Sequence, residues 1–165
     1  MFIFLLVILV ALAMLIHELG HIVMARRFKV TASELGFGLG PVLMSWRLCE
    51  LRITLRLFPA GSFVRLDGTA LEERSARQQL MVHLGGIIFN LIMAGVTYGT
   101  VFCWINLLIA GGNLLPLYQH DGWKCGVVLM RVWLRRTSQP IERAFTFSGG
   151  FLSLVVVFVI IRAFI

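Results

Sequence analysis

Long uncharged apolar blocks limit what this chain can fold into more than any other feature of its sequence. Residues 1–16 contain no charged side chain, and 59% of the 165 residues are hydrophobic, against about half in an ordinary soluble domain. An α-helix needs about 20 predominantly apolar residues to cross the hydrocarbon core of a bilayer. The blocks therefore predict an integral membrane protein, and the length of the chain predicts a single domain over residues 1–165.

The order of the apolar blocks predicts an all-α polytopic membrane protein with about four transmembrane helices. One helix is expected to be broken, because Asn113 and Pro116 interrupt its apolar run. The first span is expected to be retained rather than removed as a signal peptide, since no basic residue precedes it. The predicted spans cover residues 2–24, 80–102, 106–134 (the broken helix) and 145–164.

Residues 36–66 have the composition of a β-structure between the first two spans. Three glycines and a proline between residues 36 and 41 disfavour a helix. Leu51–Leu57 alternates apolar and polar side chains, which is typical of a half-buried strand, and Val42–Leu48 supplies a partner strand. We expect a small membrane-associated β-hairpin or sheet. It is either a surface excursion or an exposed sheet edge that pairs with an extended substrate.

The distribution of basic residues predicts how the helices are oriented. Nine of the 15 lysines and arginines lie between residues 26 and 77, and four more lie between residues 131 and 143. Four spans place both segments on one side, which the positive-inside rule makes cytoplasmic. Membrane orientation thus explains the net charge of +7, and no nucleic-acid partner is expected. Both termini are predicted outside, in a bacterial or archaeal cytoplasmic membrane.

The end of the first apolar block carries a metal-binding pentad, His17-Glu18-Leu19-Gly20-His21. Histidines four residues apart lie on one face of a helix, where both rings can bind one metal ion. Glu18 can then act as general base on a metal-bound water. His17 lies about 25 Å along its helix, so the metal is expected toward the cytoplasmic end. A hydrolytic site in this position predicts cleavage of other membrane proteins.

A catalytic zinc ion, Zn²⁺, needs a third protein ligand in addition to His17 and His21. Asp121 is the first candidate, because a carboxylate in an apolar segment is costly and is usually functional. The alternative role for Asp121 is to cap the helix that it begins. His120 is an alternative third ligand. We favour instead a position at the membrane interface or behind the metal ligands for this histidine.

Asn90 is a polar residue within the second predicted span. Its amide can donate a hydrogen bond to a developing oxyanion or hold the substrate strand. It can equally make a polar contact between helices, because Gly85 and Gly86 nearby allow close packing. The residues alone leave both roles open.

The order of three motifs points to a known family. His17-Glu18-Leu19-Gly20-His21 matches an H-E-x-G-H pentad. Gly86–Asn90 is similar to a G-P-x-x-N segment, with Ile87 in place of proline. Asn113–Gly122 is similar to an N-x-x-P…D-G segment. Together they resemble the site-2 protease family of intramembrane zinc metalloproteases.

A weaker similarity covers Pro59–Val64, which resembles the P-x-G-G-Y-V loop of that family's membrane-associated β-hairpin. Ser62 stands where the loop has a glycine. The whole resemblance extends from about Leu5 to Arg136. Neither a PDZ-like insertion nor a CBS-like tail is expected in 165 residues, so the chain resembles a minimal form of the family.

The resemblance implies a zinc metalloendopeptidase that hydrolyses peptide bonds of transmembrane substrates, single-span proteins above all, near the cytoplasmic side of the bilayer. His17, His21 and Asp121 would bind one Zn²⁺ per chain. Glu18 would activate the water, and Asn90 would help to bind substrate or to stabilise the tetrahedral intermediate. The oligomeric state is left open.

Two other functions remain as alternatives. A noncatalytic membrane adaptor would keep the protease fold without turnover, but it would not need Glu18. A prenyl-protein protease with the same pentad would need a downstream glutamate ligand. The one acidic residue after Asp121 is Glu142, which lies in a basic segment.

Overall fold

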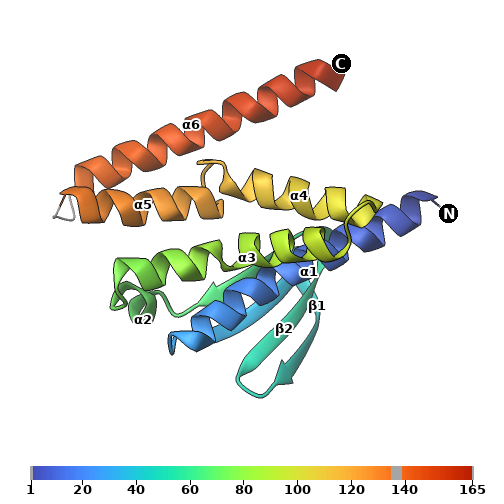
Figure 1. Ribbon diagram of the computed structural model, residues 1–165, viewed down its shortest axis with the longest axis horizontal. Coiled ribbons are helices and arrows are strands. Elements are labelled where there is room, and N and C mark those ends of the chain that lie inside the picture. The colour runs from blue at the N-terminus through green and yellow to red at the C-terminus, as the bar shows by residue number, and fades with distance from the viewer. Residues whose placement is uncertain (1, 135–138, 165) are drawn as a thin grey trace. The chain divides into compact units, whose positions relative to one another are not determined.

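The computed structural model describes residues 2–134 and 139–164 of the chain. The chain divides into two compact units, Met1–Ala110 and Gly111–Ile165. The first contains helices and one sheet, and the second is helical (Figure 1). The elements are α1 (Phe2–Arg27), β1 (Ala32–Leu48), β2 (Leu51–Leu66), α2 (Gly68–Glu72), α3 (Ala76–Val96), α4 (Val101–Leu114), α5 (Asp121–Leu134) and α6 (Gln139–Phe164). The division between the units falls within α4.

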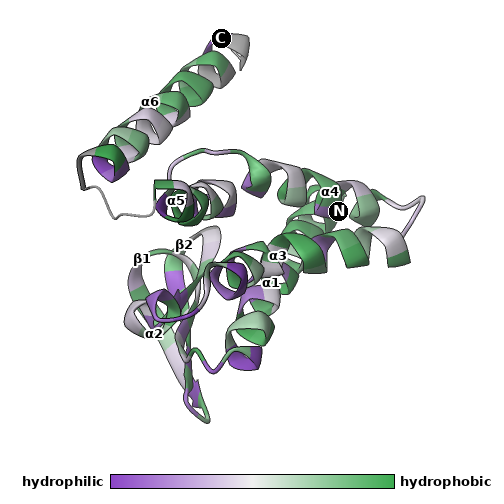
Figure 2. Cartoon of the chain, turned by 60° about the vertical axis from the view of Figure 1, so that its left-hand side comes forward, coloured by the Kyte–Doolittle hydropathy of each residue, from purple (hydrophilic) through white to green (hydrophobic). Residues whose placement is uncertain are grey.

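Three helices among the described residues are long and apolar enough to cross a membrane. They lie at Phe2–Arg27, Ala76–Val96 and Ile141–Val159, and hydrophobic residues cover most of these helices in Figure 2. The sequence predicted a span at each of these places. The segment predicted as one broken span contains most of α4 and all of α5, each 14 residues long. That these two helices together form a fourth span stays a prediction.

The predicted end of the second span at residue 102 is wrong, because α3 ends at Val96 and a turn separates it from α4. Gly99 has a φ of 80°, a left-handed conformation that glycine adopts without strain. Thr97 Oγ1 donates a 2.6 Å hydrogen bond to the last turn of α3, and Thr100 Oγ1 accepts one from the first turn of α4. These local hydrogen bonds end one helix and begin the next, and apolar periodicity does not reveal them.

The helices α1 and α3 pack closely because glycine faces glycine where they meet. A Cβ added at Gly20 would collide with the backbone of Gly85, and a Cβ added at Gly85 would lie 2.6 Å from the carbonyl oxygen of Gly20. A side chain at either position would therefore push the helices apart. The same two helices carry most of the candidate site described below.

The strands β1 and β2 form an antiparallel sheet in which β2 bends back around β1. Residues 44–48 pair with residues 51–55 in a hairpin, as predicted. Residues 34–37 have partners on both sides, at 52–55 and at 62–65. Gly61 has a φ of 89° near the bend of β2, which favours glycine there. The sheet begins at Ala32, before the predicted start at residue 36.

The interpretation of Leu51–Leu57 as an exposed sheet edge is wrong for residues 52–55, which have partners on both sides. Ile53, for example, lies between Leu35 and Trp46 in the register. In the described part of the chain, residues 44–48 and 62–66, by contrast, have a sheet partner on one side only. Alternating polarity reports that one face of a strand is buried, and it carries no information on the place of the strand in the sheet.

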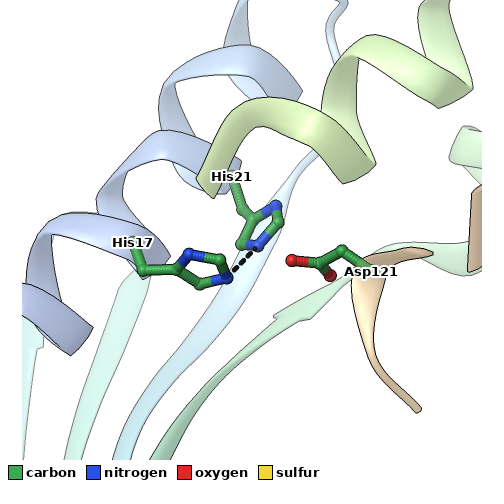
Figure 3. A group of neighbouring side chains, drawn as sticks. All are labelled: His17, His21 and Asp121. Atoms are coloured by element: carbon green, nitrogen blue, oxygen red, sulfur yellow. Dashed lines mark hydrogen bonds between the residues drawn. The ribbon is translucent and has the colours of Figure 1, made fainter. Parts of the chain in front are cut away.

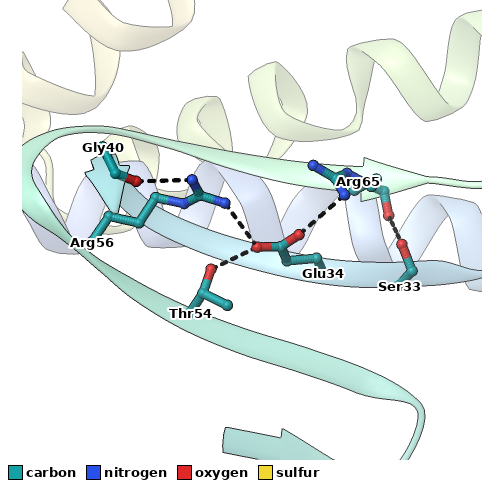
Figure 4. A network of polar contacts seen from close by, with 6 residues as sticks. All are labelled: Ser33, Glu34, Gly40, Thr54, Arg56 and Arg65. Atoms are coloured by element: carbon teal, nitrogen blue, oxygen red, sulfur yellow. Dashed lines mark hydrogen bonds and ion pairs between the residues drawn. The ribbon is translucent and has the colours of Figure 1, made fainter. Parts of the chain in front are cut away.

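A polar network centred on Glu34 joins the three segments of the sheet (Figure 4). The Glu34 carboxylate accepts hydrogen bonds from Thr54 Oγ1 at 2.8 Å and from Arg56 at 3.2 Å, and Arg65 lies 3.4 Å from its other oxygen. Burial raises the pKa of Glu34, but the hydrogen bonds and the two positive charges outweigh burial and hold the pKa below its ordinary value. The network ties the two ends of the bent strand β2 to β1.

Replacing Glu34 by glutamine is expected to destabilise the sheet by about 1–3 kcal/mol, because Arg56 and Arg65 lose their charged partner. Hydrogen–deuterium exchange of the β1 and β2 amides measures the loss. The matched control is Arg47→Gln, since Arg47 is exposed near the hairpin tip. Equal protection in Glu34→Gln and wild-type protein would contradict the role of the network.

The same network predicts a pH dependence. Because folding lowers the pKa of Glu34, the stabilisation is complete above the ordinary value of 4.5 and is lost as the pH falls through the lowered value. Amide protection in the wild-type sheet should therefore fall in acid. The Glu34→Gln variant should lack this part of the pH dependence.

Candidate metal and catalytic site

The pentad lies on α1, and its three ionisable side chains are buried. His17, Glu18 and His21 are 6%, 7% and 7% exposed. The two imidazole rings meet edge to face, with centroids 4.8 Å apart and planes inclined at 82°. The spacing of four residues thus brings both rings to one face of the helix, as predicted. Buried ionisable groups need partners, and each of the three has one from another element of the first unit.

Each imidazole uses its Nδ1 atom to bond α3. His17 Nδ1 lies 2.7 Å from Asn90 Oδ1, and His21 Nδ1 lies 2.8 Å from the carbonyl oxygen of Val82. Both partner atoms are acceptors, so each Nδ1 carries a proton and donates it. In a neutral ring the lone pair then lies on Nε2.

The two Nε2 atoms lie 3.2 Å apart and face each other (Figure 3). When both rings are neutral, two lone pairs meet at this distance, which is unfavourable unless a proton or a metal ion lies between them. Zn–N bonds of about 2.0–2.1 Å at a tetrahedral centre separate two nitrogen ligands by about 3.3 Å. The separation in this chain therefore fits two ligands of one zinc ion.

Gly86 brings the backbone of α3 against this pair of rings. A Cβ added at Gly86 would lie 2.6 Å from His21 Nε2 and 2.7 Å from His17 Nε2. Both distances are shorter than any real contact of a methyl group, so a side chain at residue 86 would displace the rings. This glycine therefore preserves the space in front of the two nitrogen atoms as well as permitting close helix packing.

Glu18 is held by the sheet. Ser62 Oγ donates a 2.8 Å hydrogen bond to Glu18 Oε1. Ser62 follows Gly61 at the bend of β2, so the bend delivers the hydroxyl group to the pentad. The role of Glu18 as general base stays a prediction.

Asn90 is completely buried, and its amide is fully engaged. Oδ1 accepts from His17, while Nδ2 donates to the carbonyl oxygen of Ala13 at 3.1 Å and to Asn106 Oδ1 at 2.7 Å. Asn90 therefore connects three helices and orients one of the two histidines. Its predicted role toward the substrate stays a prediction.

Asp121 begins α5 in the second unit, and its side chain is buried. Lys124 Nζ lies 3.0 Å from Asp121 Oδ1, one turn along the helix. A Cβ added at Gly122 would collide with the last residue of α4, so glycine permits α5 to begin close to the end of that helix. His120 precedes α5 and lies 3.4 Å, through Nδ1, from the carbonyl oxygen of Tyr118. The role of Asp121 as third ligand stays a prediction.

A family comparison identifies the chain. The model of peptidase family M50 matches residues 1–104, which contain the pentad, the sheet and α3. The chain belongs to peptidase family M50. The resemblance to intramembrane zinc metalloproteases seen in the motifs is thereby confirmed.

Relatives of this M50 chain carry the name "Putative zinc metalloprotease". One from Clostridium acetobutylicum is 33% identical over 110 residues, which cover 62% of this chain and 31% of that protein. One from Fusobacterium nucleatum is 29% identical over 96 residues, 53% of this chain and 28% of that protein. One from Thermotoga maritima is 35% identical over 94 residues, 49% and 19% respectively. The M50 chain thus spans less than a third of the length of these relatives.

Three groups that hold the pentad were not identified from the sequence. The carbonyl of Val82 carries no signal in its residue type. Ser62 departs from the glycine of the similar loop, but this departure alone does not assign a role to its hydroxyl group. Asn106 did carry a signal, because a polar amide within an apolar helix usually has a structural or functional partner.

Proposed function

We propose that this M50 peptidase hydrolyses peptide bonds of transmembrane proteins near the cytoplasmic side of the bilayer. The observation that carries the proposal is the pair of Nε2 atoms 3.2 Å apart, with Glu18 beside them on a helix apolar enough to cross a membrane. Asp121 supplies the third ligand. Two imidazoles and one carboxylate are a donor set that zinc hydrolases use, with one position left for water.

The residues of the chain divide the work of hydrolysis between them. His17, His21 and Asp121 would hold the zinc, which would lower the pKa of a bound water and polarise the scissile carbonyl group. Glu18 takes a proton from the attacking water and then passes it to the leaving amine. Ser62 holds one oxygen of the Glu18 carboxylate, and the other oxygen accepts the proton. The hydrogen bonds from Nδ1 of each histidine keep the rings in place during these steps.

An apolar groove between α1 and the sheet supports the proposal that the substrate is a transmembrane protein. Its volume is about 470 Å³, and Ser62, the partner of Glu18, is part of its wall. A helical substrate hides its amides in hydrogen bonds and must unwind before one of them is attacked. In this proposal the groove binds apolar side chains of the unwound substrate segment. The sheet edge at residues 62–66 forms hydrogen bonds with the backbone of the same segment. The lining includes Leu6, Val10, Met14, Phe37 and Leu55.

The proposed orientation rests on charge. Arg26 and Arg27 end α1, and the pentad lies nearer to this end of the helix than to the other. Because basic residues favour the cytoplasmic face, the pentad lies toward the cytoplasm, and with four spans both termini lie outside. A single-span protein is the simplest partner for one groove of this size.

The two alternative functions gain no specific support. A noncatalytic adaptor gives no reason for a buried Glu18 held by a hydroxyl group. A prenyl-protein protease would need Glu142 as a ligand. Arg131 already binds both oxygens of Glu142, at 2.7 Å and 3.2 Å.

The ligand set is tested by replacing the two acids separately. Asp121→Ala is expected to lower the zinc content of the purified chain from about one ion toward none, because three protein ligands hold a catalytic zinc. Glu142→Ala is the control and should keep both zinc and activity. Elemental analysis after dialysis measures the metal. Full zinc content in Asp121→Ala, or loss of zinc in Glu142→Ala, would contradict the assignment.

A further inference from the structure

A buried amide network in the first unit extends from the pentad to α4. Asn106 lies on α4 and is completely buried. Its Oδ1 accepts a 2.7 Å hydrogen bond from Asn90 Nδ2, and its own Nδ2 donates a 2.8 Å hydrogen bond to the carbonyl oxygen of Phe102. Burying an amide in an apolar helix costs free energy unless its hydrogen bonds are made. Asn106 makes them, and through Asn90 they lead to His17.

Two backbone carbonyl groups fix the direction of this network. A carbonyl oxygen only accepts hydrogen bonds. The carbonyl of Phe102 therefore faces the NH₂ group of Asn106, which turns Oδ1 of Asn106 toward Asn90. The carbonyl of Ala13 likewise faces the NH₂ group of Asn90, which turns Oδ1 of Asn90 toward His17. Each amide oxygen and each amide nitrogen in the series thus has a hydrogen-bond partner.

We propose that Asn106 is a positioning residue that keeps His17 in the metal-binding tautomer. If the Asn90 amide turned over, its NH₂ group would face His17 Nδ1. The ring would then keep its proton on Nε2, where the proton blocks metal binding. The inference rests on the proposed function, since it takes His17 Nε2 as a ligand.

The hydrogen bond to Asn106 makes that rotation unfavourable. Rotation would break the hydrogen bonds of Asn90 to Ala13 and to Asn106. It would also place Asn90 Oδ1 against two acceptor oxygens, the carbonyl oxygen of Ala13 and Asn106 Oδ1. A leucine at position 106 has the same number and branching of heavy atoms as asparagine and would fill the space, although its methyl groups are bulkier than the amide group. Packing alone therefore does not explain why an amide side chain occupies position 106. The need to hold the Asn90 amide in one orientation does explain it.

Zinc affinity of the full chain in detergent tests the inference. Affinity is measured by competition with a chelator for wild type, Asn106→Leu and Asn106→Asp. Asn106→Leu is expected to bind zinc about tenfold more weakly, the lower end of the effect of losing a partner behind a ligand. Aspartate in an apolar site is neutral and retains an acceptor for Asn90 and a donor for Phe102. Asn106→Asp should therefore recover most of the affinity.

Two further measurements separate positioning from folding. Thermal unfolding of the metal-free chains shows whether Asn106→Leu is folded. Nitrogen-15 spectra of the metal-free histidine rings show which ring nitrogen carries the proton: wild type should show Nδ1 for His17, and Asn106→Leu a mixture. Cys103→Ala, which alters another buried side chain of α4, should leave the spectrum unchanged.

The possible failures are distinguishable. Wild-type zinc affinity and an unchanged His17 tautomer in Asn106→Leu would overturn the inference and leave the proposed function intact. An equal loss of affinity in Asn106→Asp and Asn106→Leu would also overturn it. A wild-type chain that binds no zinc would defeat the proposed function, and the inference with it.

Discussion

Replacing Gly86 by alanine is expected to abolish zinc binding and peptide hydrolysis together. The new methyl group would lie 2.6 Å from His21 Nε2 and 2.7 Å from His17 Nε2. The rings cannot simply move aside, because Asn90 and the backbone of Val82 hold them from behind. The methyl group therefore takes the place of the metal or forces the histidines out of position. Overpacking also costs about 1–3 kcal/mol of stability.

The control for Gly86→Ala is Gly95→Ala on the same helix. A Cβ at Gly95 meets nothing within 4 Å, so this change adds helix propensity without a steric conflict. Zinc affinity, by chelator competition, and unfolding temperature are measured for both variants. Gly95→Ala should bind zinc like wild type. Zinc binding by folded Gly86→Ala at wild-type affinity would show that the two Nε2 atoms are not ligands of one ion.

The long helices follow directly from the composition of the chain. α1 and the apolar part of α6 lie where uncharged runs predicted them, because an α-helix satisfies its own backbone hydrogen bonds where no water is present. The end of α3 was misplaced because it depends on two threonine side chains and a glycine in a left-handed conformation. Such local competition for backbone groups does not change the hydropathy pattern.

The sheet was predicted in its pairing but not in its shape. Alternating polarity located the hairpin of residues 42–57 correctly. The return of β2 along the other side of β1 depends on the conformation at Gly61 and on Glu34, which bonds residues from both ends of β2. These are contacts between residues distant in sequence, and a periodic pattern cannot encode them.

The site was predicted where residue spacing determines geometry. Two histidines four apart on a helix must share a face, and the rings do. The histidines have partners on α3 and Glu18 has one on the sheet, and these contacts depend on how the elements pack. A backbone carbonyl such as that of Val82 offers no residue to recognise, whereas Asn90 was detectable as an amide in an apolar span. The role of Asp121 still rests on its chemistry and its motif.

Replacing Glu18 by glutamine is expected to lower the rate of peptide hydrolysis by about 10²–10⁴-fold while zinc stays bound. Glutamine has the shape of glutamate, and its oxygen can still accept the hydrogen bond of Ser62. It cannot take the proton of the attacking water, so the loss should appear in kcat. Glu18 is not a proposed ligand, so zinc affinity should remain close to that of wild type. The control is Glu50→Gln, an identical change at an exposed position of the hairpin.

Comparison of membranes from cells that contain wild-type, Glu18→Gln or Glu50→Gln protein extends this test to the substrate. If the chain is a peptidase, single-span proteins should accumulate uncut with Glu18→Gln and not with Glu50→Gln. If it is a noncatalytic adaptor, the three membranes should have the same protein composition, since binding does not require a base. Continued cleavage at the wild-type rate by zinc-loaded Glu18→Gln protein would remove Glu18 from the role of base. The pentad would then be a metal site without the hydrolytic chemistry assigned to it.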